Sequence, residues 1–243
     1  MQNQYDPRTT SRIDPAISVG VPRAVRDAGL RSYMLKVYNY MASGVLLTGI
    51  VALLFASSGV AAQVMATPLK WLIILAPLGF VFAMSFGANR MQTGTLQTLF
   101  WGFAVAMGLS MSTIFLVYTG VSIAQTFFAV TGAFMGLSLY GYTTKKDLSG
   151  FGTFLIMGVI GLLIAMVINI FLQSTAMHFA ISAIGVLLFA GLTAYDTQKI
   201  KSTYAHVAGT DMMGKAAILG ALTLYLDFIN MFQFMLSFMG NRD

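Results

Sequence analysis

Seven long apolar runs, almost free of charged side chains, leave this chain few ways to fold. A helix of about 20 apolar residues spans the hydrocarbon core of a bilayer. Only 9% of the 243 residues are charged, against about 25% in a soluble domain. Strands of a barrel would alternate apolar and polar residues, which these runs do not. We therefore predict an all-α integral membrane protein with seven transmembrane helices, at residues 38–56, 71–88, 96–118, 121–142, 151–172, 177–195 and 216–239.

The basic residues predict the orientation of these helices. If the N-terminus is cytoplasmic, twelve of the fourteen Lys and Arg residues lie on the cytoplasmic side, and only Lys70 and Arg242 lie outside. Basic residues concentrate on the cytoplasmic side of membrane proteins. Seven spans then place the C-terminus outside. The net charge of +6 is explained by topology, so we expect no nucleic-acid partner.

Residues 1–36 carry no apolar period and read as a mobile, basic cytoplasmic tail, followed by a transmembrane domain over residues 37–243. The charge-free stretch 91–144 is long enough for two helices, with a hinge at Thr119 and Gly120. Glycine pairs at helical spacing, such as Gly132 and Gly136, would allow close helix packing. The chain has no Cys, which excludes disulfides and thiolate sites.

Two acidic residues fall in or beside the predicted spans. A carboxylate at membrane depth is costly and usually serves a function. Asp227 lies well inside the last span, whereas Asp196 lies where the sixth span ends. For Asp227 the alternative is a structural hydrogen bond, and for Asp196 it is an ordinary interfacial acid at a helix end.

Asp227 belongs to a polar stripe on the last helix, with Thr223, Asn230 and Gln233 at helical spacing. Because such a stripe cannot face lipid, the last helix is expected at the centre of the bundle. About twenty residues connect the sixth and last spans, so these can be antiparallel neighbours whose aspartates meet. Counting residues nevertheless places Asp196 nearer the cytoplasmic boundary than Asp227.

The histidines and the two acids also bear on metal binding and catalysis. His178 and His206 are expected on opposite sides of the membrane, where they cannot share one metal. Intramembrane aspartyl proteases also carry two acids on consecutive spans, but their Gly-x-Gly-Asp and Pro-Ala-Leu motifs are missing from this sequence. We therefore expect no enzyme activity and no tightly bound cofactor.

The segments around both aspartates resemble the signatures of the Bax inhibitor family. They are Gly-Leu-Thr-Ala-Tyr-Asp-Thr-Gln-Lys-Ile at 191–200 and Leu-Thr-Leu-Tyr-Leu-Asp-Phe-Ile-Asn-Met-Phe at 222–232. The resemblance implies six helices around a central seventh, in the inner membrane of a bacterium. It also implies a pH-sensitive calcium leak channel with Asp196 and Asp227 as the pH sensor. A basic residue of the second helix, here Arg90 by position, would latch to them.

On this reading, lipid surrounds the protein, protons act on the aspartate pair and Ca²⁺ is the permeant ion. Two carboxylates close together in a low dielectric cannot both ionise cheaply. A shared proton would hold the last two helices together, and its loss would create an anionic oxygen site for Ca²⁺ at Asp196 and Asp227. The main alternative is a regulatory protein that binds another membrane protein, such as a protease or a stress factor.

Overall fold

The computed structural model describes residues 23–241 and contains seven helices that are long and apolar enough to cross a membrane. The predicted fold class is therefore confirmed. The elements are α1 (Arg23–Ser57), α2 (Val60–Met65), α3 (Leu69–Gly87), α4 (Thr93–Met111), α5 (Ile114–Val117), α6 (Gly120–Thr143), α7 (Ser149–Leu172), α8 (Thr175–Val207) and α9 (Met212–Met239).

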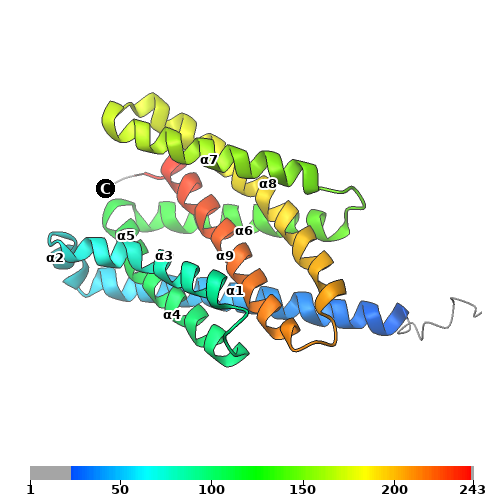
Figure 1. Ribbon diagram of the computed structural model, residues 1–243. Helices are drawn as coiled ribbons and strands as arrows, with labels where there is room; N and C mark the ends of the chain where they lie inside the picture. Colours follow the sequence, from blue (N-terminus) through cyan, green and yellow to red (C-terminus); the bar gives the residue numbers. More distant parts are fainter. Residues whose placement is uncertain (1–22, 242–243) are drawn as a thin grey trace, which may run out of the picture.

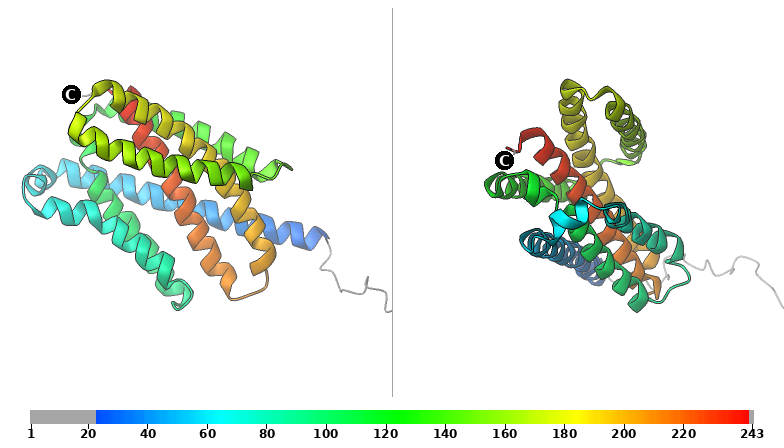
Figure 2. Two further views of the ribbon diagram at one scale, coloured as in Figure 1. Left: turned by 45° about the horizontal axis from the view of Figure 1, so that its top comes forward. Right: turned by 90° about the vertical axis from the view of Figure 1, so that its left-hand side faces the viewer.

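The last helix lies at the centre of the bundle, as the polar stripe predicts. In the most apolar window of α9, 56% of the residues are buried, against 11% for α3 and for α7. Helix α9 packs against α8, α1, α6 and α4, while α3 packs on α4 and α7 on α8 (Figures 1 and 2). The arrangement is a central helix within an inner group, flanked by two outer helices.

Two helices are short: α2 lies in the connection between the first and second spans, and α5 forms the end of the third span. Helix α2 joins α1 to α3. Helix α5 continues the direction of α4, and the chain then reverses at Thr119, whose hydroxyl accepts a hydrogen bond from the Ser122 N–H at the start of α6. The break falls at the hinge that the sequence predicts.

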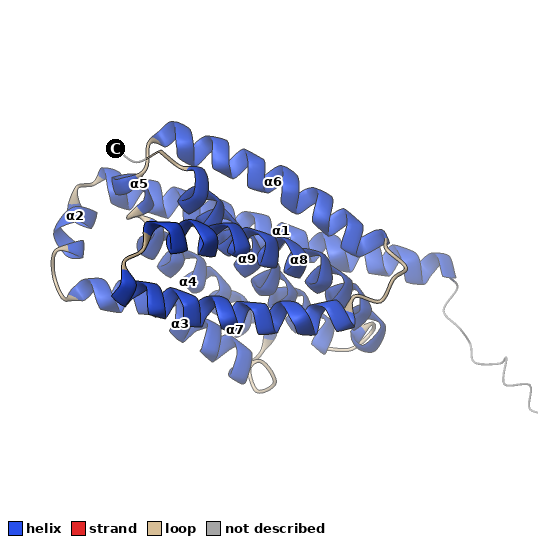
Figure 3. Cartoon of the chain, turned by 90° about the horizontal axis from the view of Figure 1, so that it is seen from above, coloured by secondary structure: helices blue, strands red, loops and turns tan. Residues whose placement is uncertain are grey.

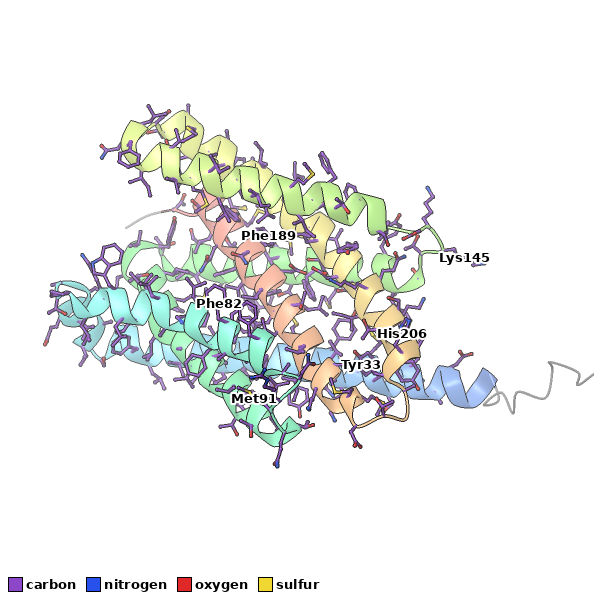
Figure 4. All side chains as sticks on the ribbon, viewed as in Figure 1. Tyr33, Phe82, Met91, Lys145, Phe189 and His206 are labelled. Carbon is purple, nitrogen blue, oxygen red and sulfur yellow. The ribbon has the colours of Figure 1, made fainter. Side chains whose placement is uncertain are left out.

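All connections rich in basic residues lie at one end of the bundle, which we call the basic end. The start of α1, the turn between α3 and α4, and the loops α6–α7 and α8–α9 are found there (Figure 1). Lys145 and His206 mark this end in Figure 4. The C-terminal end of α9 lies at the opposite end, with α2 and the connection between α7 and α8.

Two predicted boundaries differ from the structure. Helix α1 already begins at Arg23, so residues 23–36 of the predicted tail are helical, while residues 1–22 lie outside the described part. Helix α8 continues to Val207 instead of ending near residue 195, and only residues 208–211 join it to α9. The expectation of about twenty connecting residues is therefore wrong.

Polar side chains explain why α8 continues beyond the apolar run. Lys201 Nζ donates a hydrogen bond of 2.6 Å to the Tyr142 carbonyl, at the last turn of α6, where carbonyls lack helical partners. The Gln198 amide accepts from the Leu148 N–H at 2.9 Å and donates to the Lys146 carbonyl at 2.8 Å. This part of α8 thus fixes the loop between α6 and α7. Because the residues that do so are polar, hydropathy alone does not reveal that the helix continues.

Candidate functional site: a buried pair of aspartates

The carboxyl groups of Asp196 and Asp227 lie within hydrogen-bonding contact of each other, between α8 and α9. Asp196 is 8% exposed and Asp227 is 4% exposed. A hydrogen bond between two carboxyl groups requires a proton on one of them, because an ionised carboxylate only accepts. The sequence predicts that the two aspartates meet if the last two helices are antiparallel neighbours, and the structure shows this contact.

One oxygen of this pair has no hydrogen-bond partner. Among the described residues, the buried side-chain atoms without a partner are Asp227 Oδ2 and the hydroxyl of Tyr33. An unsatisfied buried polar atom costs free energy, and natural structures keep few of them. The pair is thus poorly suited to stabilise the fold and well suited to bind a proton or a cation.

The close approach of α6 to α8 helps to hold Asp196 in place. A Cβ atom on Gly141 would collide with the backbone carbonyl of Ala194, two residues before the aspartate. The hydroxyls of Ser138 on α6 and Thr197 on α8 lie 3.2 Å apart.

The glycines that were predicted to allow close helix packing lie elsewhere on α6. Gly132 and Gly136 have no neighbouring atom within 4 Å of an added Cβ. That packing prediction is wrong for these two glycines.

The extension of α8 also decides where Asp196 lies in its helix. Asp196 is eleven residues before the end of α8 at Val207, so it is no terminal residue. The interpretation of Asp196 as an acid at a helix end is therefore wrong. Residue counting placed Asp196 at a helix end because it took the end of the apolar run as the end of the helix.

The basic residue that acts on Asp196 is Lys199, which follows it by three residues on α8. Lys199 Nζ also lies 5.8 Å from the ring centre of Tyr195. Arg90, the residue suggested as a latch, is exposed after the end of α3. The charged groups that act on Asp196 and Asp227 within residues 23–241 do not include it. The structure brings the two aspartates together and leaves Arg90 apart from them.

The other members of the stripe on α9 bond mainly within their own helix. The Thr223 hydroxyl donates to the Leu219 carbonyl, and the Asn230 amide donates to the Leu226 carbonyl. Gln233 is exposed and lines a cavity of about 420 Å³ between α7, α8 and α9, together with Asn230. The stripe therefore runs from the buried pair into a cavity nearer the opposite end of the bundle.

That cavity contains a polar cluster that the sequence analysis missed. The Ser237 hydroxyl lies 2.8 Å from His178 Nε2, and the Ser182 hydroxyl donates to the Ser237 hydroxyl at 3.2 Å. His178 and Ser182 are four residues apart, so they share one face of α8. This spacing is the signal that could have found the cluster. We call His178, Ser182 and Ser237 the outer cluster.

A buried hydroxyl pair between α9 and α1 was also missed. Tyr225, two residues before Asp227, is fully buried, and its hydroxyl lies 2.6 Å from the Thr48 hydroxyl on α1. The Thr48 hydroxyl donates in turn to the Ala104 carbonyl on α4. The bond fixes the rotation of α9 against α1 and α4.

The aspartates alone do not form a complete metal site. In the part of the chain that the structure describes, no group of three or more His, Cys, Asp or Glu side chains could hold a metal ion. A resident Ca²⁺ takes six to eight oxygen ligands.

Comparison with known proteins now places this geometry in a family. The sequence matches the family described as "Inhibitor of apoptosis-promoting Bax1" over residues 30–243. The chain belongs to the Bax inhibitor family. The resemblance of the two aspartate segments is thereby confirmed, and both segments lie inside the matched region.

Relatives within the Bax inhibitor family cover nearly the whole chain. The inner membrane protein YbhL of Escherichia coli (strain K12) is 46% identical over 219 residues, covering 88% of this chain and 94% of that protein. An uncharacterized protein of Rickettsia prowazekii (strain Madrid E) is 50% identical over 218 residues, covering 89% and 92%. An uncharacterized membrane protein of Streptococcus pyogenes (serotype M3) is 34% identical over 221 residues, covering 89% and 96%.

Proposed function

We propose that this protein is a pH-sensitive calcium leak channel of a bacterial inner membrane, with its N-terminus in the cytoplasm and its C-terminus outside. The observation that carries the proposal is the contact between the buried carboxyl groups of Asp196 and Asp227. The proposed location rests on the charge asymmetry of the loops and on the likeness to an inner membrane protein.

The proposed gate has two states that differ by a proton. With a shared proton the carboxyl groups would bond to each other and hold α8 against α9. Without it, two anions face each other in a low dielectric and repel. They then offer hard oxygen ligands that attract Ca²⁺. Loss of the proton would therefore favour the open state, in which α8 and α9 are separated. Ca²⁺ is the cargo in this scheme, and no resident cofactor is required.

Calcium flux into dye-loaded liposomes tests this proposal. We expect wild-type flux to change between about pH 6 and pH 8, where a coupled carboxylate pair can titrate. Asp196→Asn and Asp227→Asn should each flatten that profile, because either change removes one member of the pair. Lys199→Gln should shift the profile without removing it, because Lys199 acts on the pair from outside.

A matched control is available in the loop between α8 and α9. Asp211 is exposed and makes no side-chain cap to α9, so Asp211→Asn is the same chemical change without a buried partner and should keep the wild-type profile. If both buried variants keep that profile as well, the aspartates are not the sensor. If wild-type protein passes no Ca²⁺ at any pH, regulation through a membrane-protein partner becomes the better proposal.

A paired aspartate geometry also suits an intramembrane aspartyl protease, where two carboxyl groups activate water. Such an enzyme needs space for a substrate helix beside the acids. Neither aspartate lines the large cavities found within residues 23–241. We therefore expect no cleavage of a membrane-embedded helical peptide by the purified protein. Cleavage that Asp227→Ala abolishes would favour the protease instead.

A further inference from the structure

A long apolar groove separates α1 from α6. These two helices extend along the same side of the bundle (Figure 3) and line a cavity of about 670 Å³. Its walls include Tyr38 and Met41 on α1 and Phe134 and Leu139 on α6, and Phe228 of α9 reaches it from the centre. The groove opens toward the surface that meets the bilayer, so hydrocarbon is its natural content.

The end of this groove at the basic end is positively charged. Arg31 lines it directly. Tyr142 lines it from α6, and Lys201 Nζ lies 5.0 Å from the Tyr142 ring centre and is bonded to its carbonyl. Lys145 follows α6 in the next loop. The acidic residue nearest in sequence to Arg31, Asp27, precedes it by one helical turn and does not line the groove.

We infer that this groove binds one anionic phospholipid of the leaflet at the basic end, with an acyl chain along α1 and α6 and the headgroup at Arg31 and Lys201. From Arg31 to Val45, α1 provides a wall about 21 Å long at 1.5 Å per residue. Half of a bilayer core is about 15 Å thick, so one acyl chain fits this length.

The composition of the groove favours a lipid over a packed helix. Methionine and aromatic side chains adapt to a flexible chain, whereas close helix packing in membranes relies on small residues. Basic pockets between transmembrane helices on the cytoplasmic side bind anionic headgroups. A neutral lipid would fill the apolar part equally well but would bring no negative charge to Arg31, which lines the groove, or to Lys201, which lies beside Tyr142 at the same end.

The bound lipid would also touch residues next to the aspartate pair. Phe228 follows Asp227 directly, and Ser138, another residue of the groove, lies 3.2 Å from the hydroxyl of Thr197, which follows Asp196. The groove therefore connects the lipid composition of one leaflet to the packing around the pair. The binding site itself does not depend on the proposed calcium function.

Tryptophan quenching by lipids with brominated acyl chains tests the inference. Both native tryptophans, Trp71 and Trp101, are first replaced by Phe. Leu139→Trp then reports on the groove, and Phe154→Trp is the control on the outer helix α7; the native side chains are 62% and 66% exposed. Both positions lie a short distance from the loop between α6 and α7, so their depths are comparable.

In phosphatidylcholine vesicles, brominated phosphatidylglycerol should quench the groove tryptophan about five-fold more effectively than brominated phosphatidylcholine at equal mole fraction. One basic residue near an anionic surface gives a preference of this order. The control tryptophan should show no preference. Adding Arg31→Gln and Lys201→Gln should remove the preference but leave quenching by either lipid.

Two results would overturn the inference. Equal quenching of the groove tryptophan by both lipids would mean that ordinary bilayer lipid fills the groove without headgroup recognition. Quenching of the control alone would mean that protein, such as a second copy of the chain, covers the groove. Native mass spectrometry of retained phosphatidylglycerol, with and without Arg31→Gln, gives the same decision if the tryptophan variants do not fold.

Discussion

The interface between α8 and α9 has two halves with opposite chemistry. The half toward the basic end holds two buried carboxyl groups, one of which keeps an oxygen without a partner. The other half holds the outer cluster, in which His178, Ser182 and Ser237 bond to one another beside an open cavity. The same two helices thus carry a hydrogen-bonded network of His and Ser side chains at one end and a pair of acids with one unpartnered oxygen at the other.

The largest effect is expected where α6 closes on the charged half. Gly141→Val would push a side chain into the Ala194 carbonyl, and overpacking against a rigid neighbour costs about 3 kcal/mol of unfolding free energy. Thermal unfolding in detergent measures the loss. Gly136→Val on the same helix has open space and should change stability little. Similar losses in both variants would show that helix propensity, and not the close approach, is responsible.

Replacing both buried acids should change stability in the opposite direction. Asp196→Leu combined with Asp227→Leu removes two carboxyl groups that are 8% and 4% exposed, one of them incompletely bonded. Apolar replacement of a whole buried ionic group is often neutral or stabilising, whereas removal of one partner leaves the other uncompensated, so we expect the double variant to raise the unfolding free energy by about 1–2 kcal/mol. A clear loss of stability would instead make the pair a structural element.

The outer cluster should behave as an ordinary stabilising network. Ser237→Ala removes its contacts with His178 and Ser182, and hydrogen bonds between membrane helices contribute about 0.6 kcal/mol on average. A decrease of this size in unfolding free energy is expected, with Ser202→Ala as control because Ser202 is exposed and bonds within its own helix. If Ser237→Ala increased the unfolding free energy instead, the outer cluster would not be a stabilising network and would not differ in this respect from the aspartate pair.

The smallest effect concerns an acid outside the membrane. The hydroxyl and the backbone N–H of Ser149 bond to Asp147 and hold the pKa of that carboxyl below its usual value. The stabilisation that the ionised Asp147 carboxylate gives to the start of α7 is therefore present at neutral pH and is lost as the pH falls through the lowered pKa. Amide hydrogen exchange in the first turn of α7 should increase on acidification, and Asp147→Asn should remove that pH dependence. Unchanged exchange in wild type would contradict this.

Much of the fold could be predicted from the sequence because hydrocarbon thickness sets a length that apolar runs must match. An apolar run ends where polar residues begin, although the helix can continue. The apolar run of the sixth span therefore missed the last part of α8 and placed Asp196 wrongly at a helix end. Glycine spacing was a poor guide, since it does not tell which face a neighbour covers; Gly141 is the tight position and Gly136 is open.

The aspartate pair was found because each acid is costly in a membrane. The outer cluster was not found because His178 was considered only as a metal ligand, and its bonds and those of Ser182 to Ser237 join residues 59 and 55 positions apart. Such contacts depend on how two helices are rotated against each other, which a single sequence does not state. The assignment of Arg90 as a latch rested on its position in the sequence alone, whereas in the structure the basic residue that acts on Asp196 is Lys199.

The continuation of α8 beyond Asp196 makes that helix a lever. Eleven residues extend from the aspartate to Val207, an arm of about 16 Å at 1.5 Å per residue. Near its tip, the Tyr204 ring lies 5.4 Å from the ring of Tyr33, and the Tyr204 hydroxyl leaves no room for a side chain at Gly29. A tilt of about 10° around the pair would displace that tip by about 3 Å. Because the tip rests on the first turns of α1, a tilt of α8 around the pair would also change the contact between Tyr204 and Tyr33.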